Sequence, residues 1–381
     1  MNVAVPLEAA PNEARVALVP ETVAKLTKAG VSVKVARGAG ERAAFPDELY
    51  TQAGATVEGD PAALLSDADL VVTVGRPSES VLAAMPKRAA LLGLLAPLGD
   101  APYVKQLAGA GITALSMDAI PRITRAQSMD ALSSQSNIAG YKAVLLAAAA
   151  LPRFFPMLTT AAGTIPPAKV LILGAGVAGL QAIATARRLG AVVSAYDTRA
   201  VVKEQVQSLG ASFLEIDLGV DAQAAGGYAK ELTPEQIDKQ RQFMVDAIGA
   251  SDAVITTALV PGRPAPLLIT EQAVAAMKPG SVIVDLAAEA GGNCALTQRD
   301  QIVRSPNGVQ IIGTTNLPST MPYHASQLYS RNVHALLNVL IKDGALALDM
   351  NDEIARGTTL VHAGEIVHTP TLEALGIGAA P

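Results

Sequence analysis

The 381-residue sequence predicts an α/β protein with two doubly wound parallel-sheet domains joined by long helices. The first observation is that short apolar runs, bounded by turn residues, alternate with helix-forming segments along most of the chain. The second is a composition of 50% hydrophobic but only 3% aromatic residues, which suits strands of Ala, Val, Leu and Ile buried under helices. The third is a length greater than that of one ordinary domain.

The first 120 residues alternate between strand and helix signals. Strands are expected at 3–6, 31–36, 70–74, 90–95 and 112–116, and helices at 20–29, 46–53 and 101–110. Strands that are separated by helices form a parallel, doubly wound sheet. Gly38 and Gly40 follow a strand, but no acidic partner or closely packed helix follows them, so we interpret them as a plain turn.

A polar stretch at 121–137 separates the two halves and leads into a long helix, expected from Asn137 to about Ala150. Residues 152–168 contain several prolines and cannot form one helix. They predict an irregular arm or a short hairpin.

Three glycines, Gly174, Gly176 and Gly179, join an apolar strand to a helix. In this G-x-G-x-x-G pattern the first glycine permits a tight turn, the second lets a pyrophosphate approach the backbone, and the third allows close helix packing. Asp197 ends the next expected strand, where a carboxylate accepts hydrogen bonds from ribose hydroxyls. The pattern predicts a Rossmann-like fold that binds NAD(H) rather than NADP(H). Arg199 weakens the preference for NAD(H) because it could pair with a 2′-phosphate. The alternative to a nucleotide site is an α/β turn that uses its glycines only for packing.

The second half continues the strand and helix alternation. Strands are expected at 170–173, 192–196, 212–216, 253–257, 281–285 and 309–313, and helices at 180–189, 201–209, 235–249, 271–277 and 324–340. Six strands with helical crossovers match a full dinucleotide-binding sheet. Because one long helix leaves the first domain and another returns, we expect domains at 1–131 with 325–381 and at 132–324, with the cofactor in the cleft.

Composition excludes several other classes of function. The net charge is −5 and no basic run occurs, so we expect no nucleic-acid partner. Cys294 is the only cysteine, which excludes an intrachain disulfide and a thiolate zinc site, and the four histidines lack ligand spacing. We therefore expect no metal and a reducing cytosol. No signal peptide is visible, and the longest apolar segment, 143–151, is shorter than the roughly 20 residues that span a bilayer.

The segments that carry a family resemblance include 122–141, 160–164, 255–259 and 284–294. The chain closely resembles the NAD(H)-binding component of proton-translocating NAD(P) transhydrogenase over essentially its full length. The resemblance implies that hydride passes directly between NADH and NADP⁺ held on a separate NADP(H)-binding beta subunit. It also implies a homodimer, docked on a membrane-embedded proton-channel subunit, in which the 152–168 arm exchanges between subunits. Since this sequence stops at Pro381, we expect the proton channel on other chains and a cytoplasmic, peripheral location at the inner membrane.

The resemblance also implies site residues. Those on the nicotinamide and its ribose would be Arg122, Gln127, Asp130 and Ser133, which would also act in the reaction, and Ile123 and Thr124 would be further cofactor contacts. Those on the pyrophosphate and adenosine would be Gly174, Gly176, Val177, Gly179, Asp197, Thr198 and Arg199, and those closing over the nucleotide would be Gly227, Gln240 and Leu259. Hydride transfer between two nicotinamides needs proximity rather than a general acid or base. Helix capping by Ser128, Asp130 and Ser133, with Arg125 as a solvated charge, is the structural alternative.

Alanine dehydrogenase is the runner-up family, similar over the whole length. Oxidative deamination requires a cation for the substrate carboxylate and an acid/base group. Arg15 matches that family's arginine, but its lysine would fall at Gly75 and its histidine at about Leu94, and Arg76 cannot act as a base. A third hypothesis is an NAD-sensing module without catalysis, against which the polar 122–133 loop argues.

Overall fold

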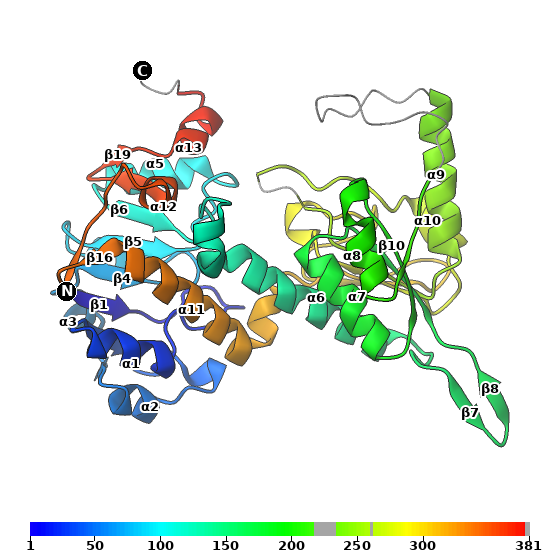
Figure 1. The fold of residues 1–381 in the computed structure, drawn as a ribbon, viewed down its shortest axis with the longest axis horizontal. Helices are drawn as coiled ribbons and strands as arrows, with labels where there is room; N and C mark the ends of the chain where they lie inside the picture. The colour runs from blue at the N-terminus through cyan, green and yellow to red at the C-terminus, as the bar shows by residue number, and fades with distance from the viewer. Residues whose placement is uncertain (217–233, 260–261, 378–381) are drawn as a thin grey trace. The chain divides into compact units, whose positions relative to one another are not determined.

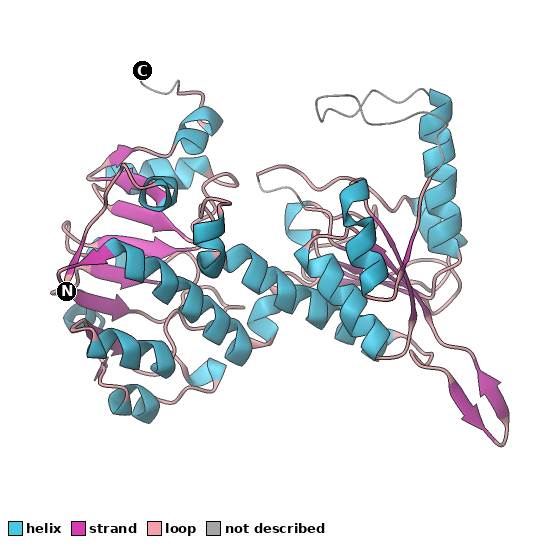
Figure 2. Cartoon of the chain, in the orientation of Figure 1, coloured by secondary structure: helices cyan, strands magenta, loops and turns pink. Residues whose placement is uncertain are grey.

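The computed structural model describes residues 1–216, 234–259 and 262–377. The chain forms two compact units, Met1–Gln135 with Pro318–Pro381, and Ser136–Leu317. Each unit is built around its own sheet, and helices flank both sheets (Figures 1 and 2). The α/β prediction is therefore confirmed.

The sheet of the first unit has the order β19-β18-β6-β5-β4-β1-β2-β3. Its strands are β1 (Asn2–Val5), β2 (Ser32–Ala36), β3 (Thr56–Glu58), β4 (Leu70–Val72), β5 (Ala90–Gly93), β6 (Thr113–Ser116), β18 (Thr359–His362) and β19 (Glu365–Ile366). The strands from β1 to β6 pair in parallel, whereas β18 and β19 pair antiparallel at one edge. Strands β3, β18 and β19 were not predicted from the sequence, and all three lie toward the edges of the sheet.

Helices and short connections complete the first unit. They are α1 (Pro20–Lys28), η1 (Glu41–Ala43), α2 (Asp47–Gln52), α3 (Pro61–Leu65), α4 (Glu79–Ala84), α5 (Ala101–Gly109), η2 (Thr124–Met129), α11 (Pro322–Leu340), the hairpin of β16 (Ile341–Lys342) with β17 (Ala345–Leu346), α12 (Glu353–Thr358) and α13 (Thr369–Ala374). Helix α11 buries Tyr329, Val333 and Leu337 in the core of this unit. The long C-terminal helix that the sequence predicts thus belongs to the first unit.

The sheet of the second unit has the order β11-β10-β9-β12-β13-β15-β14. Its strands are β9 (Lys169–Leu173), β10 (Val192–Tyr196), β11 (Ser212–Phe213), β12 (Ala253–Thr256), β13 (Val282–Asp285), β14 (Ile302–Arg304) and β15 (Gln310–Ile312). All six predicted strands are present and parallel, and the edge strand β14 is an unpredicted antiparallel addition. The strand order reverses between β9 and β12, the point at which open α/β sheets bind ligands.

The helical elements of the second unit are α7 (Val177–Arg188), η3 (Ala200–Val202), α8 (Lys203–Ser208), α9 (Pro234–Gly249), α10 (Glu271–Ala276) and η4 (Ala288–Ala290). The short helix η5 (Leu317–Thr320) precedes α11. Helix α6 (Ala131–Ala150) begins in the first unit and continues into the second, where Gly140 lies so close to α7 that a Cβ would overlap the carbonyl of Ala178. The predicted start of this helix at Asn137 was wrong.

The arm at 152–168 contains a two-stranded antiparallel hairpin, β7 (Leu158–Thr160) with β8 (Gly163–Ile165). This confirms the short hairpin that the sequence allows, and Figure 1 shows it extending away from the sheet of the second unit. No helix among the described residues is both long enough and apolar enough to cross a membrane.

Candidate nucleotide-binding site

The glycine turn lies between β9 and α7, at the carboxyl edge of the second sheet. Gly174 has φ = 98°, and a Cβ there would lie 2.5 Å from Oγ1 of Thr257. A Cβ on Gly179 would overlap the carbonyl oxygen of Gly174, so this glycine allows the close approach of helix and turn. At Gly176, by contrast, a Cβ would meet nothing within 4 Å. The open position is the one where a pyrophosphate needs room, beside the N-terminus of α7.

Asp197 follows β10 directly, and its carboxylate is held at four points. Oδ2 accepts a hydrogen bond from the backbone N–H of Ala175 at 2.7 Å, and Oδ1 accepts one from that of Arg199 at 2.8 Å. The guanidinium of Arg199 pairs with both oxygens at 3.0 Å. The carboxylate therefore lies against the glycine turn, as the fingerprint requires, with Arg199 covering it.

The other predicted residues of the second unit lie on the same sheet edge or on α9. Val177 begins α7 and is 41% exposed, Leu259 follows β12 and is 50% exposed, and Thr198 lies beside Asp197. Gln240 lies on α9, where its side-chain amide donates to the hydroxyl of Tyr196 at 3.2 Å. Gly227 lies outside the described residues.

The second group of predicted residues lies in the first unit, along η2 and the start of α6. Ala126 and Met129 are buried and anchor η2 in the core, whereas Arg122, Thr124 and Gln127 are at least partly exposed. The side chains of Arg122 and Gln127 have no hydrogen-bond or ion-pair partner within the described part of the chain. Ile123, just before η2, is partly buried. A guanidinium and an amide that are accessible and unpaired are available to a polar ligand.

Asp130 caps α6. Its carboxylate accepts hydrogen bonds from the backbone N–H of Ser133 at 2.9 Å and from the hydroxyl of Ser133 at 2.6 Å. This N-cap explains why α6 begins at Ala131, ahead of the predicted start. Capping therefore accounts for part of the polar cluster, and each oxygen of Asp130 retains capacity for a further donor.

Three contacts that sequence reasoning missed hold this region in place. Asn332 on α11 donates to the carbonyl of Ser128 at 2.8 Å and accepts from the hydroxyl of Ser134 at 2.6 Å. Arg125, which is a solvated charge only in the structural alternative, pairs with Asp352 at 2.8 Å. Polar side chains on α11 and at the start of α12 thus fix the backbone that carries Arg122 and Gln127.

The arginine that would clamp a substrate carboxylate is already paired. Arg15 is buried and forms a two-point ion pair with Glu13, with distances of 2.7 and 2.6 Å. A third guanidinium hydrogen bond, of 2.8 Å, goes to the side-chain oxygen of Gln135. The charge of Arg15 is therefore balanced within the first unit.

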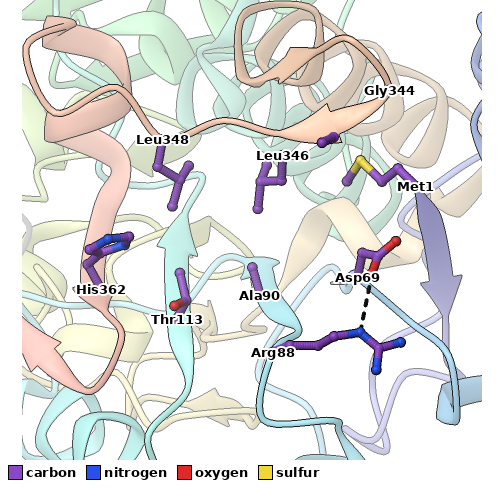
Figure 3. A pocket seen from close by; sticks show the side chains of 10 residues that line it. Met1, Asp69, Arg88, Ala90, Thr113, Gly344, Leu346, Leu348 and His362 are labelled. Atoms are coloured by element: carbon purple, nitrogen blue, oxygen red, sulfur yellow. Dashed lines mark hydrogen bonds and ion pairs between the residues drawn. The ribbon is translucent and has the colours of Figure 1, made fainter.

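Two cavities lie away from these residues. One of about 420 Å³ opens at the amino ends of β4, β5 and β6, and Figure 3 shows Leu346 and Leu348 on one side of it and Arg88, Ala90 and Thr113 on the other. The second, of about 460 Å³, lies beside α9 at the amino ends of β9 and β10. Because ligands of open α/β sheets bind at the carboxyl ends of the strands, neither cavity is the nucleotide site.

Comparisons with known proteins cover nearly the whole chain. The family model described as "Alanine dehydrogenase/PNT, N-terminal domain" matches residues 4–139, and the model described as "Alanine dehydrogenase/PNT, C-terminal domain" matches residues 143–369. The chain is 49% identical to an NAD(P) transhydrogenase alpha-subunit protein of Rhodospirillum rubrum, over 99% of this chain and 100% of that protein. It is 46% identical to NAD(P) transhydrogenase subunit alpha of Haemophilus influenzae, over 96% of this chain and 71% of that protein.

Solved structures agree with the sequence matches. The transhydrogenase of Sinorhizobium meliloti aligns with a TM-score of 0.88 and 45% identity, covering 96% of this chain and 100% of that one. An L-alanine dehydrogenase aligns with a TM-score of 0.81 and 27% identity, covering 99% of each chain.

Proposed function

Because the chain belongs to the alanine dehydrogenase/PNT family, we propose that it is the NAD(H)-binding subunit of a proton-translocating NAD(P)⁺ transhydrogenase. In this proposal hydride passes directly between NADH on this chain and NADP⁺ on a partner subunit. A membrane-embedded subunit couples the transfer to proton movement. The chain is an enzyme only together with its NADP(H)-binding partner.

The single observation that carries the proposal is the geometry of the glycine turn beside Asp197. Gly174 and Gly179 have no room for side chains, whereas Gly176 is open, so the backbone N–H groups at the start of α7 can meet a pyrophosphate. Asp197 offers a carboxylate to ribose hydroxyls at the same edge, and it would repel a 2′-phosphate. These residues fit NAD(H).

The residues of the first unit would position the reactive end of the nucleotide. Bound NADH supplies the hydride from C4 of its nicotinamide. Gln127 can hold a carboxamide because its own amide is unpaired, and Arg122 can fix the face of the ring. Asp130 and Ser133, already joined by two hydrogen bonds, can hold ribose hydroxyls. Such residues act by orientation, which can lower the barrier by roughly 7–11 kcal/mol.

The hairpin arm supports the proposed homodimer. Phe154, Met157 and Ile165 are 50%, 63% and 44% exposed along 152–168. Large apolar side chains on an extended arm are typical of a segment that packs on another chain. A second copy of this chain is the proposed occupant, so sedimentation should give a dimer and Met157→Asp should weaken it. A native monomer would contradict the dimer without affecting the site.

The location is proposed from the partners alone. A subunit that passes hydride to NADP⁺ on one partner and is coupled to a proton channel in another would lie at the cytoplasmic side of the inner membrane, peripherally.

The decisive test mixes this protein with an NADP(H)-binding subunit that is active with its own NAD(H)-binding subunit. Hydride transfer from NADH to an NADP⁺ analogue is then followed by absorbance. Gln127→Ala should slow the transfer, whereas Gln106→Ala, an exposed glutamine on α5 in the same unit, should not. No transfer by the native protein would overturn the proposal.

Alanine dehydrogenation is the alternative function, and the first unit argues against it. Arg15 is paired with Glu13, and glycine and leucine stand at positions 75 and about 94, where that family's lysine and histidine would fall. No acid/base group is thus provided for imine chemistry at these positions. Turnover of L-alanine with NAD⁺ by the pure protein would reverse this ranking.

A further inference from the structure

Asp285, the last residue of β13, is completely buried, and its carboxylate gathers the loops at the carboxyl edge of the second sheet. Its hydrogen-bond donors are the hydroxyls of Thr256 (2.8 Å) and Thr297 (2.6 Å) and the backbone N–H groups of Ala287 (3.0 Å), Asn293 (2.7 Å) and Cys294 (3.1 Å). A buried carboxylate with this many donors is tightly fixed, because each lost bond would leave a buried polar atom unpaired.

The chain reaches this carboxylate through a sharp turn. Gly291 and Gly292 have φ values of 97° and 87°, a region that favours glycine. A Cβ on Gly292 would lie 2.8 Å from Oδ2 of Asp285. The two glycines therefore bring the backbone of Asn293 onto the carboxylate, with its side chain directed to another loop.

The side chain of Asn293 joins that loop at three points. Its Nδ2 donates to the carbonyls of Ala258 at 2.9 Å and Pro266 at 2.8 Å, and its Oδ1 accepts from the N–H of Ala258 at 3.1 Å. Asn293 is itself 0% exposed. Because this buried side-chain amide both donates to and accepts from Ala258, it fixes the position of that residue.

Ala258 lies between Thr257, which contacts the glycine turn, and Leu259, a residue of the proposed nucleotide site. Thr257 donates its hydroxyl to the carbonyl of Gly174 at 3.0 Å, which joins this loop to the glycine turn. Leu259, on the other side, is half exposed and is a proposed nucleotide contact. The hydrogen bonds that join Asp285 to Asn293 and Asn293 to Ala258 therefore connect to the glycine turn through Thr257.

We propose that Asn293, held by Asp285, is a positioning residue for NAD(H), because it fixes the Thr257–Leu259 segment against the glycine turn. This inference rests on the proposed function, since it concerns the same nucleotide site. Asn293 does not act on the reacting atoms. Without it, NADH would have to order the segment on binding, and the affinity would fall.

Asn307 provides a matched control in the same unit. Its side chain donates to the carbonyls of Val274, Ala275 and Met277 and accepts from Ser305, so it is an equally well bonded asparagine. It precedes β15 and hence lies at the amino edge of the sheet, away from the glycine turn. Asn→Asp at either position removes the amide donors from carbonyl groups and keeps the size of the side chain.

The experiment compares NADH binding and urea denaturation of the full-length native protein, Asn293→Asp and Asn307→Asp. Both variants should lose stability, and Asn293→Asp the more because Asn293 is fully buried. Only Asn293→Asp should weaken NADH binding, by about tenfold, the effect of one lost net hydrogen bond. Equal NADH affinities for the two variants would overturn the inference, whereas failure of the native protein to bind NADH would overturn the proposed function instead.

If Asn293→Asp does not fold, a milder variant still tests the positioning role of Asn293. Thr297→Val removes one hydroxyl from Asp285 and leaves Asn293 intact. It should weaken NADH binding in the same direction by a smaller factor, and an unchanged affinity would contradict the positioning role.

Discussion

Asp197 and Arg199 form a two-point ion pair across the carboxyl end of β10, with Nε and Nη2 of the arginine each 3.0 Å from a carboxylate oxygen. Burial alone would raise the pKa of Asp197, but the hydrogen bonds from Arg199 and from the backbone of Ala175 outweigh it and lower the pKa. The carboxylate is therefore ionised at neutral pH. Because Arg199 occupies the oxygens that ribose hydroxyls would use, its side chain must move when NADH binds as proposed.

Replacing Asp197 and replacing Arg199 should shift the preference between NADH and NADPH in opposite directions. Asp197→Ala removes the carboxylate that would accept hydrogen bonds from the ribose and leaves the guanidinium of Arg199 free. The affinity for NADH should therefore fall by about tenfold or more, and the preference for NADH over NADPH should narrow. Arg199→Ala exposes the carboxylate and should leave NADH binding unchanged or tighter while weakening NADPH binding. Titration of nicotinamide fluorescence measures both, because the chain has no Trp. Weaker NADH binding by Arg199→Ala would contradict this role and would support the nucleotide contact that the resemblance implies for Arg199.

The three glycines of the turn should respond differently to alanine. Gly179→Ala forces a Cβ onto the carbonyl of Gly174 and should cost about 1–3 kcal/mol of unfolding free energy. Gly176→Ala meets no atom within 4 Å and has φ = −77°, so it should fold normally yet obstruct the pyrophosphate. Urea denaturation and NADH titration separate the two effects. Native-like NADH binding by Gly176→Ala would show that the open position is not the phosphate site.

The strand, turn and helix around the three glycines were predictable for a physical reason. The conformation at Gly174, Gly176 and Gly179 depends on one turn and on one adjoining helix, so a local pattern contains nearly all the information. The central strands β12 and β13 were likewise predictable, because every residue in them is buried and apolar runs mark them.

The features that could not be predicted from the sequence depend on distant partners or weak patterns. The edge strands β3 and β14 are short and partly exposed, so no alternation or apolar run distinguishes them. Asn293 bonds a residue 35 positions away and Asn332 one 204 positions away, and a single asparagine carries no periodic signal. The early start of α6 depends on recognising Asp130 as a cap rather than as part of a polar loop.

Asn332 should matter for hydride transfer as well as for stability. Asn332→Ala removes the bonds to Ser128 and Ser134 that hold η2, and so loosens Arg122 and Gln127 without altering the second unit. Because small displacements slow an oriented reaction, transfer with the partner subunit should fall by about tenfold. Asn338→Ala is the control on the same helix, since Asn338 is exposed and makes a 3.4 Å contact with His334. Equal rates for both variants would contradict a positioning role.

Glu8 occupies the corresponding switch point of the first sheet, between β1 and β4. Its carboxylate accepts hydrogen bonds from the backbone N–H groups of Val74 at 2.6 Å and Gly75 at 3.1 Å. Burial nevertheless raises the pKa of Glu8 from 4.5 to about 7, although these two bonds act to lower it. The folded protein therefore holds a proton on Glu8 over a pH range in which the unfolded chain has released it.

The sign of the resulting pH dependence follows from that raised pKa. Stability from protonated Glu8 is fully present below about pH 4.5, the value for the unfolded chain, and is lost as the pH rises through about 7. Between pH 5 and 8 the unfolding free energy should fall by on the order of 2 kcal/mol from this group. Glu8→Gln should remove that part of the slope. Glu21→Gln should not, because the pKa of Glu21 is lowered by Lys25 and Arg331 and its titration lies below this range. Urea denaturation at several pH values tests this, and a native-like slope in Glu8→Gln would assign the dependence to other groups.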